Sequence, residues 1–332
     1  MQKRKLGNSD LYLTTVGFGT WGMSGTGWRG SWGPQDDSDS INAIIRAYEL
    51  GVNWIDTAPV YGLGHSEEIV GKAIKQLPER PIIATKLALR WDDQGNITRC
   101  LKKESVREEA ENSLKRLGID VIDLYQIHWP IDDNIDEVLE GWATMAELIK
   151  EGKVRYIGVS NFNVELLEKI SKIHPVTSLQ PQYSMIKREV EKELLPYCGK
   201  NNIGVVCYSP MAKGLLTGAF SKERVEKLSD EDHRKMTPDF QDPLLSNTLE
   251  MVEKLRPIAE RNGRTLSQLA IAWVLRRPEV TSAIVGVRRP SQIEETAPAG
   301  DWNLSDEDIA DIQLILEEYE RKSAAPPAKS VL

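Results

Sequence analysis

Residues 40–62 read SINAIIRAYELGVNWIDTAPVYG and contain the repeating unit of the fold. In their first half, isoleucine and tyrosine side chains recur at helical spacing, which predicts an amphipathic helix over Asp39–Leu50 that ends at Gly51. Their second half contains the short apolar run Asn53–Asp56, which is bounded by turn residues and is predicted to be a strand. A helix that leads directly into a short apolar strand is typical of α/β proteins.

The same alternation continues along the chain. Strands are predicted at Thr15–Gly19, Asn53–Asp56, Ile82–Lys86, Ile122–His128, Tyr156–Ser160, Ser178–Gln182, Gly204–Ser209 and Ser282–Val287. Helices are predicted at Asp39–Leu50, Ser66–Ile74 with Ser66 as its cap, Ser105–Leu117, Ile135–Lys150, Val164–Ile173, Val190–Asn201, Leu249–Asn262, Leu266–Arg276 and Asp306–Arg321. Eight strands, each followed by a helical pattern, indicate a closed parallel (β/α)8 barrel, the TIM barrel.

The main alternative is a doubly wound open sheet. That fold carries a glycine-rich fingerprint between its first strand and the helix that follows. The stretch Gly17-Phe18-Gly19-Thr20-Trp21-Gly22 resembles this fingerprint, but a loop rich in tryptophan and glycine follows it instead of a helix. The sequence therefore favours the barrel.

Three segments lie outside the alternation. Residues 1–14 precede the first strand, and we expect them to form a hairpin over the barrel floor. Trp21–Pro34 and the polar stretch Met211–Ser246 are long loops at strand C-termini, where barrel enzymes carry functional residues. We expect one barrel domain over residues 1–332, with a core at about 6–320 and a flexible tail at 322–332.

The composition excludes several classes of protein. The net charge is −8 and no long basic run occurs, so nucleic acid is not an expected partner. No apolar stretch is long enough to span a membrane, and no signal-peptide pattern follows the basic residues Met1–Lys5, so a cytoplasmic protein is predicted. Cys100, Cys198 and Cys207 form no CxxC motif, which argues against a disulfide framework or a zinc site. Cys207 lies in an apolar run and is expected to be buried.

Polar residues stand at the C-terminal ends of consecutive predicted strands. Asp56 ends the second strand, Lys86 the third and His128 the fourth, and Tyr61 follows Asp56 by five residues. Each alone has an ordinary explanation, such as a loop brace, a solvated end residue or a structural histidine. Because the carboxyl ends of barrel strands meet at one mouth, we expect the four side chains to converge there.

These four residue types suit the reduction of a carbonyl group, which needs a hydride donor and a proton donor for the developing alkoxide. Tyrosine, with an unperturbed pKa of about 10, is a weak acid unless a cation stabilises its phenolate. Lys86 would supply that cation, Asp56 would balance the lysine, and His128 would orient the substrate oxygen. One aspartate and one histidine are too few ligands for a catalytic zinc ion, and no metal is predicted.

Four stretches together resemble the signatures of the aldo-keto reductase superfamily, in the expected order. They are Trp54-Ile55-Asp56-Thr57-Ala58-Pro59-Val60-Tyr61-Gly62, Thr85-Lys86, Asp123-Leu124-Tyr125-Gln126-Ile127-His128 and Ile157-Gly158-Val159-Ser160-Asn161-Phe162. The match extends from about Leu6 to about Tyr319. Within the superfamily the chain is most similar to the bacterial reductases related to the potassium-channel β subunits.

The resemblance implies roles for individual residues. Tyr61 would be the proton donor, tuned by Lys86 and Asp56, and His128 would orient the substrate. Ser160, Asn161 and Gln180 would hold the nicotinamide carboxamide, and Tyr208 would stack on the nicotinamide ring. The loop after the seventh strand would bind the pyrophosphate with Lys213, where the family often has arginine. Further residues implied in cofactor binding are Gly19, Thr20, Trp21, Asp56, Ser209, Pro210, Met211, Gly214 and Gly286.

The stretch after the eighth strand, residues 286–296, resembles the adenosine site of the family. The resemblance implies that Arg288 and Gln292 would reach the 2′-phosphate of NADPH and that Glu295 would bind the adenine amine. The lysine and serine that grip the phosphate in the aldose-reductase branch are here Gly286-Val287, and the usual asparagine is Thr296. NADPH is the predicted cofactor. A solvated charged face is the other reading of Arg288 and its neighbour Arg289.

Five tryptophans are candidates for the mouth of the barrel: Trp21, Trp28, Trp32, Trp91 and Trp129. Trp21, Trp91 and Trp129 are predicted to line the substrate site with Tyr61 and His128. For Trp28 and Trp32, packing within a loop is an equally good interpretation. An aromatic mouth suits flat or apolar carbonyl compounds and also sugars, whose C–H faces stack on indole.

The sequence therefore predicts an NADPH-dependent aldo-keto reductase acting on a small carbonyl compound or sugar, or on the alcohol in reverse. Two other functions stay open. A cofactor-binding regulatory subunit would bind NADPH without turnover, although the chain begins close to its first predicted strand and the extension of such subunits is not expected. A redox-neutral lyase or epimerase would convert its substrate without net change in NADPH. The sequence leaves the substrate, the reaction direction and the oligomeric state open.

Overall fold

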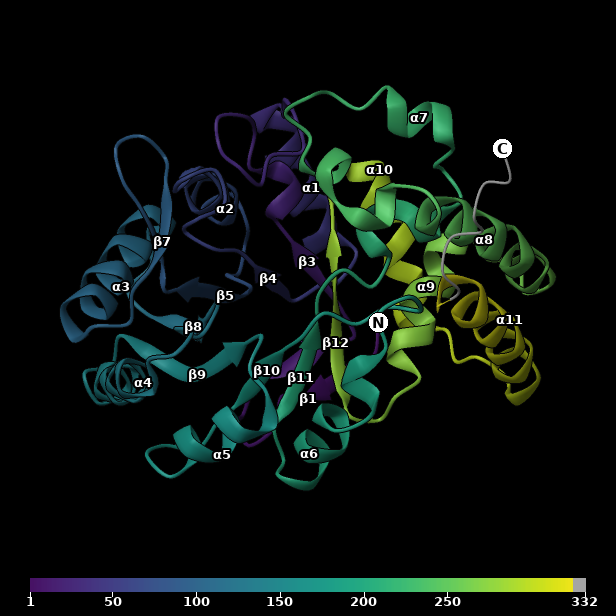
Figure 1. Ribbon diagram of the computed structural model, residues 1–332. Coiled ribbons are helices and arrows are strands. Elements are labelled where there is room, and N and C mark those ends of the chain that lie inside the picture. The colour runs from purple at the N-terminus through teal and green to yellow at the C-terminus, as the bar shows by residue number, and fades with distance from the viewer. Residues whose placement is uncertain (325–332) are drawn as a thin grey trace, which may run out of the picture.

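Eight parallel strands close into a barrel in the computed structural model, which describes residues 1–324 (Figure 1). In order around the barrel they are β3 (Val16–Gly19), β4 (Trp54–Asp56), β5 (Ile82–Leu87), β8 (Ile122–Ile127), β9 (Val154–Ser160), β10 (Ser178–Gln180), β11 (Gly204–Cys207) and β12 (Val280–Gly286). The last strand pairs with the first, so that Ala283 lies opposite Val16. This closure confirms the TIM barrel and excludes the open sheet.

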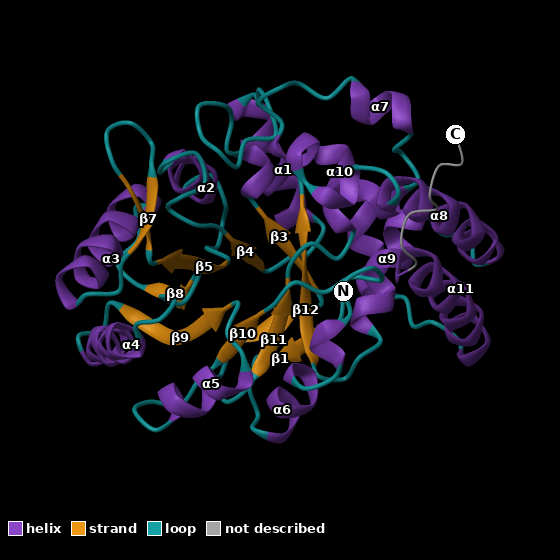
Figure 2. Cartoon of the chain, in the orientation of Figure 1, coloured by secondary structure: helices purple, strands orange, loops and turns teal. Residues whose placement is uncertain are grey.

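Helices surround the strands, as Figure 2 shows with strands in orange and helices in purple. They are α1 (Asp37–Glu49), α2 (His65–Ile74), α3 (Lys103–Leu117), α4 (Ile135–Lys150), α5 (Val164–Ser171), α6 (Leu194–Lys200), α8 (Leu244–Arg261), α9 (Leu266–Leu275) and α11 (Asp306–Ala324). Local signals fix several of their ends. Asp36 accepts hydrogen bonds from two backbone amides at the start of α1, and Thr265 forms a capping box with Gln268 at the start of α9. A helix lies at each of the nine predicted positions, and the largest shift is at α8, which begins five residues before the predicted start at Leu249.

Some helix predictions are wrong in detail. Ser66 is not a cap, because α2 begins one residue earlier and its cap is Gly64, in a left-handed conformation with φ of 105°. The single helix predicted at Val190–Asn201 is divided into the short turn η2 (Glu189–Glu191) and α6. The structure also contains α7 (Lys222–Glu226) and α10 (Pro290–Thr296), which are too short for a clear periodic signal.

The N-terminal hairpin is present as predicted. Strands β1 (Lys3–Lys5) and β2 (Tyr12–Thr14) pair antiparallel. Leucines of this hairpin pack with Trp54 and with side chains of β5, β8 and β11 in one buried cluster. Gly7 lies so close to Gly204 that a Cβ atom would come within 2.5 Å of the Gly204 amide nitrogen, so only glycine fits there. The hairpin thus closes the N-terminal end of the barrel.

A second hairpin, which the sequence analysis did not predict, follows β5. Its strands are β6 (Leu89–Trp91) and β7 (Ile97–Arg99). The turn between them is fixed by Asp92, whose Oδ1 accepts hydrogen bonds from the backbone amides of Gln94 and Asn96 at 2.9 Å each. Because β6 starts two residues after β5 ends, the hairpin lies beside the C-terminal mouth of the barrel.

The loop after β11 is built from short helical turns. These are η3 (Ala212–Thr217), α7, η4 (His233–Met236) and η5 (Pro238–Phe240). Figure 1 shows the green segment beside α7 reaching across to the purple loop near α1, which contains η1 (Trp21–Met23). The two loops predicted to carry functional residues therefore meet over the mouth.

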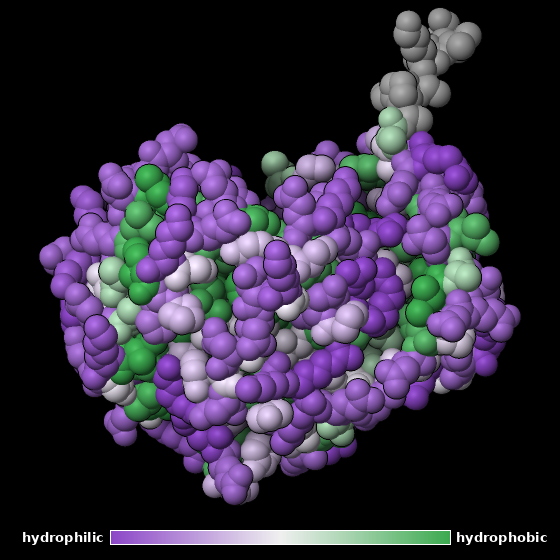
Figure 3. All heavy atoms as spheres, turned by 90° about the horizontal axis from the view of Figure 1, so that it is seen from below, coloured by the Kyte–Doolittle hydropathy of each residue, from purple (hydrophilic) through white to green (hydrophobic). Residues whose placement is uncertain are grey.

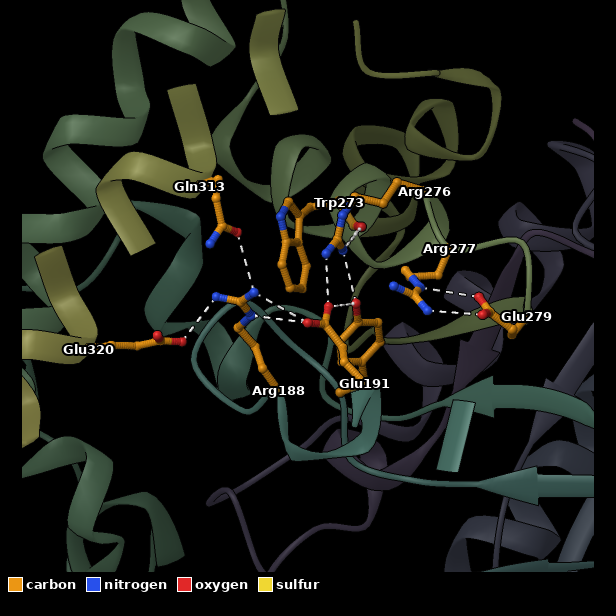
Figure 4. A network of polar contacts seen from close by, with 9 residues as sticks. Arg188, Glu191, Trp273, Arg276, Arg277, Glu279, Gln313 and Glu320 are labelled. Carbon is orange, nitrogen blue, oxygen red and sulfur yellow. Dashed lines mark hydrogen bonds and ion pairs between the residues drawn. The ribbon is translucent and has the colours of Figure 1, made fainter. Parts of the chain in front are cut away.

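A network of arginines and acids fixes the last helix to the barrel (Figure 4). Arg188 pairs with Glu320 of α11 at 3.0 Å and with Glu191 at 3.3 Å. Glu191 in turn pairs with Arg276 at 2.8 Å, and the Arg276 guanidinium lies 3.6 Å from the centre of the Trp273 ring. These contacts join the segment after β10, the end of α9 and α11 into one rigid corner.

The surface is mostly hydrophilic on the face shown in Figure 3, where hydrophobic residues form small separate groups. Within residues 1–324, no helix is both long and apolar enough to cross a membrane. Cys207 is fully buried, as expected, and all three cysteines are free. The predicted flexible tail falls largely outside the described residues, and the cytoplasmic location stays a prediction.

Candidate active site

A cavity of about 630 Å³ opens at the C-terminal ends of the strands. It brings together most of the residues singled out in the sequence. Those that line it are Gly19, Thr20, Trp21, Asp56, Tyr61, His128, Trp129, Ser160, Asn161, Gln180, Tyr208, Ser209, Pro210, Met211, Lys213, Gly214, Gly286, Gln292 and Glu295. The predicted convergence at one mouth is thus present in the structure.

Lys86 lies beneath the cavity and is fully buried. Its Nζ atom donates to Asp56 Oδ2 at 2.7 Å and to the Thr57 carbonyl at 2.8 Å, and it lies 3.4 Å from the Tyr61 hydroxyl. Side chains alternate along a strand, so Lys86 points into the barrel while Thr85 points outward to Glu67 on α2. The ammonium group therefore joins the end of β4, the end of β5 and the phenol.

Burial dominates the titration of these groups. It lowers the pKa of Lys86 against the opposing effect of Asp56, and it raises the pKa of Tyr61 well above 10, with a further contribution from the Asp56 charge. The positive charge of Lys86 alone would lower the pKa of Tyr61, whereas burial and the Asp56 charge raise it. Burial and then the Lys86 charge hold the pKa of His128 well below its usual range. At neutral pH the site thus presents a protonated phenol and a neutral imidazole.

Hydrogen bonds connect Asp56 to Gln180 of β10 and, through Gln180, to Ser160 of β9, whose Oγ atom accepts from the Asn161 amide at 3.0 Å. Gln180 Nε2 donates to Asp56 Oδ1 at 2.8 Å, and Ser160 Oγ donates to the Gln180 carbonyl at 2.7 Å. The Asn161 amide donates to the His128 carbonyl at 2.9 Å, and Asn161 Oδ1 accepts from the Tyr208 hydroxyl at 2.9 Å. Asn161 has a positive φ of 62°, which turns its side chain back over the mouth. The predicted carboxamide-binding residues thus form one connected group beside the Asp56–Lys86 pair.

Aromatic rings surround Tyr61. Trp21 stacks on it with centroids 6.0 Å apart and an interplanar angle of 10°. Trp28 is tilted against it at 6.1 Å, and His128 meets it edge-on at 5.7 Å. Both Trp28 and Trp32, whose role the sequence left open, line the cavity. The phenol is therefore held on several sides.

The hairpin β6–β7 supplies a wall that the sequence analysis missed. Leu89 and Ile97 line the cavity from this hairpin. Trp91 lies outside the cavity lining as the structure describes it, and the Arg116 guanidinium packs 6.0 Å from the centre of its ring. The alternation Leu89-Arg90-Trp91, followed by turn residues and by the run Ile97–Arg99 with which it pairs, is the signal that could have indicated this hairpin.

At the adenosine end of the predicted site, Arg288 and Arg289 have different surroundings. The Arg288 guanidinium bonds to Gln35 Oε1 at 2.7 Å, to the Trp32 carbonyl at 3.3 Å and to the Pro34 carbonyl, and it is not among the described lining residues. Arg289 is exposed and lines the cavity. Neither a hydrogen bond nor an ion pair is found for its side chain within residues 1–324. Arg288 thus holds the loop after Trp32, while Arg289 faces the cavity.

Four cationic side chains line the cavity: Lys213, Arg224, Arg234 and Arg289. The local basic pocket that a chain of net charge −8 needs in order to bind an anion is therefore present. Arg224 and Arg234 were missed in the sequence because they lie in a polar loop with no periodic pattern. Arg234 is paired with Asp232 at 2.5 Å and lies 4.4 Å from the centre of the Trp32 ring.

Comparison with known proteins agrees with this geometry. Residues 15–317 match the model of the aldo/keto reductase family. The chain belongs to that family. It is 39% identical to aldo-keto reductase YhdN of Bacillus subtilis over 96% of this chain and 94% of that protein, and 35% identical to the NADH-specific methylglyoxal reductase of Escherichia coli over 97% and 100%.

Solved structures give the same result. The glycerol dehydrogenase AKR11B4 from Gluconobacter oxydans superposes with a TM-score of 0.87 at 34% identity, covering 99% of this chain and 98% of that one. The holo form of aldo-keto reductase AKR11C1 from Bacillus halodurans gives a TM-score of 0.77 at 29% identity, covering 95% and 96%. The predicted family is thus confirmed. The closer relation to potassium-channel β subunits stays a prediction.

Proposed function

We propose that this protein is an NADP-dependent oxidoreductase that transfers a hydride between nicotinamide and the carbonyl carbon of a small aldehyde or ketone, or the reverse. The observation that carries the proposal is the position of the Lys86 ammonium group. It is fully buried, lies 2.7 Å from Asp56 Oδ2 and 3.4 Å from the Tyr61 hydroxyl, and is directly below the cavity. An acid–base group next to a buried ion pair suits general acid–base catalysis, because the buried charges tune its proton affinity.

The chemistry follows from the protonation states. A bound nicotinamide dinucleotide would supply the hydride to the carbonyl carbon. As negative charge develops on the substrate oxygen, Tyr61 donates its proton to that oxygen, and the product is the alcohol. The nearby Lys86 charge then stabilises the phenolate until solvent protonates it again. The neutral imidazole of His128 donates a hydrogen bond that orients the oxygen.

The residues of the cavity fit a dinucleotide. Four cations face a single cavity in a negatively charged chain, which suits a polyanion. We assign the pyrophosphate to Lys213 and the backbone of Gly214. Lys213 has a positive φ of 56°, and Gly214 one of 101°, so the backbone curls there as it does at anion-binding turns. Ser160, Asn161 and Gln180 would hold the carboxamide, and Tyr208 would stack on the ring.

For the 2′-phosphate we propose Arg289 together with Gln292. The sequence pointed to Arg288, but three acceptors already bind its guanidinium. Gln292 Oε1 accepts from the Arg288 amide at 2.7 Å, which fixes Gln292 beside Arg289. The exposed Arg289 therefore supports a preference for NADPH over NADH. The Escherichia coli relative is named as NADH-specific, so the affinities for NADPH and NADH are both measured.

The test is a panel of carbonyl compounds that includes methylglyoxal, simple aldehydes, ketones, pyridoxal and keto-sugars, followed by the absorbance of the reduced nicotinamide. We expect turnover with NADPH for at least one member, and oxidation of the corresponding alcohol with NADP⁺. Tight NADPH binding with no turnover across the panel would favour a regulatory subunit. Conversion of substrate without net loss of NADPH would favour a redox-neutral enzyme.

A further inference from the structure

Three aromatic rings form a continuous stack from the bottom of the cavity to the segment that covers it. The Tyr61 and Trp21 rings stack with centroids 6.0 Å apart, and the His233 ring also stacks on Trp21, with centroids 5.0 Å apart and an interplanar angle of 26°. Trp21 belongs to η1 and His233 to η4, which are more than 200 residues apart in the sequence. We call residues 229–237, which contain η4, the cover segment.

The cover segment is fastened to the loop that carries Trp21. The His233 amide donates to the Ser31 carbonyl at 3.0 Å, and the His233 Nδ1 atom lies 3.3 Å from the same oxygen. The next residue, Arg234, packs its guanidinium on the Trp32 ring at 4.4 Å. Since Trp21 and Trp32 are themselves tilted against each other at 6.0 Å, the segment and the loop form one aromatic layer.

His233 contributes to this layer as a neutral ring. Burial, and next the charge of Lys213, lower the pKa of His233 to about 4, and Arg234 acts in the same direction while Asp232 opposes it. Its Nε2 atom and the Trp32 Nε1 atom are buried without a hydrogen-bond partner among residues 1–324. Ring packing and the contacts to Ser31 therefore hold the histidine in place.

We propose that His233 is a positioning residue for the proposed reaction: its ring packs on Trp21, Trp21 stacks on Tyr61, and this contact chain fixes the orientation of the proton donor. The proposal rests on the proposed function of Tyr61. It goes beyond that function because it makes the orientation of Tyr61 depend on the position of the cover segment.

The physical reason lies in how weakly Tyr61 is held by polar contacts. Its hydroxyl lies 3.4 Å from Lys86, which is at the long end of a hydrogen bond. The orientation of the phenol therefore depends on the rings around it. His128 and Trp28 hold it from the barrel side and the N-terminal loop, but Trp21 has His233 on it only while the cover segment is in place. Movement of the segment away from the Trp21 loop would remove His233 from Trp21, so the donor would be ordered only with the segment in place.

The experiment compares His233→Ala, His233→Phe and the control Met236→Ala. Met236 lies on the same η4 turn but its side chain is 79% exposed. The measurements are the single-turnover rate of hydride transfer with saturating NADPH, kcat and KM for a substrate from the panel, and near-ultraviolet circular dichroism, which reports the packing of the aromatic stack.

We expect His233→Ala to slow the single-turnover rate by roughly tenfold or more, the scale of a misplaced catalytic group, with a smaller change in KM and a weaker dichroism band. His233→Phe restores a ring and should recover most of the rate, and Met236→Ala should behave as wild type. An unchanged rate in His233→Ala would overturn the proposal. A rate as low in His233→Phe as in His233→Ala would also overturn it, because the bond to Ser31 and not the stack would then matter. Absence of turnover in the wild type would instead refute the proposed function.

Discussion

Lys86 Nζ and Asp56 Oδ2 lie 2.7 Å apart, and both side chains are almost completely shielded from solvent. A charge in such a place is stable only with its partner. The pair therefore acts both as a structural support, joining β4 to β5, and as the electrostatic environment of Tyr61. Its two roles give separate predictions.

The first prediction concerns the stability of the pair. Asp56→Asn or Lys86→Met alone leaves one buried charge without its partner and should lower the free energy of unfolding by about 3–5 kcal/mol. The double variant removes both charges, so its loss of unfolding free energy should be clearly smaller than the sum of the losses in the two single variants. Denaturant unfolding of the four proteins measures this coupling. Strictly additive losses would mean that the two charges do not stabilise each other.

The second prediction concerns the proton donor. Tyr61→Phe removes only the hydroxyl and keeps the ring between Trp21 and His128. Cofactor affinity should persist, while turnover falls by roughly 10²-fold or more, the scale of general acid catalysis. Steady-state kinetics and fluorescence titration with NADPH separate the two quantities. Tyr12→Phe, at a position with 55% exposure, is the matched control. Wild-type kcat in Tyr61→Phe would show that another group donates the proton.

The third prediction concerns cofactor preference. Arg289→Ala would remove the proposed charge-assisted contact with the 2′-phosphate, so the Kd for NADPH should rise by roughly 10- to 100-fold while the Kd for NADH changes little. Arg288→Ala loosens the loop that Arg288 holds through Gln35, so it should weaken the binding of both cofactors to a similar extent. Both Kd values can be measured by fluorescence quenching. A loss confined to NADPH in Arg288→Ala would return the phosphate site to Arg288, as the sequence first indicated.

The fourth prediction concerns pH and Glu109, a buried carboxyl on α3 that accepts hydrogen bonds from the Ala88 amide and Ser105 Oγ at 3.0 Å each. Burial raises its pKa to about 7 from an ordinary value of 4.5. The folded protein therefore binds this proton more tightly than the unfolded chain. Stability from this group is greatest below about pH 4.5 and falls as the pH rises to about 7, by about 3 kcal/mol in total.

Glu109→Gln should remove this slope, so the variant gains stability relative to wild type between pH 5 and pH 8. Thermal or denaturant unfolding at several pH values measures the effect. Glu108→Gln, at the neighbouring exposed position that pairs with Arg90, should keep the wild-type slope. A difference between Glu109→Gln and wild type that stays constant over this pH range would mean that Glu109 does not titrate there.

The sequence by itself determined the barrel and the position of its catalytic candidates. Strands and helices are local periodic patterns, and a residue at the carboxyl end of a strand such as Asp56 or Lys86 must reach the mouth of a barrel once the fold is known. Ser160, Gln180 and Tyr208 were assigned to the same site through the resemblance to the family, and the structure places them at or directly after the ends of β9, β10 and β11.

Only the tertiary structure decided which loop side chains beyond the strand ends face the cavity and which hold the loops together. Arg288 and Arg289 are adjacent and chemically alike, yet only the contacts of Arg288 to residues about 250 positions earlier assign one to the loop and the other to the cavity. The same holds for Trp91, which packs against the Arg116 guanidinium and is not among the described lining residues, and for His233, which contacts Trp21 from a remote loop. Side-chain direction in a loop depends on long-range packing rather than on a period of 2 or 3.6 residues, so no local pattern in the sequence records it.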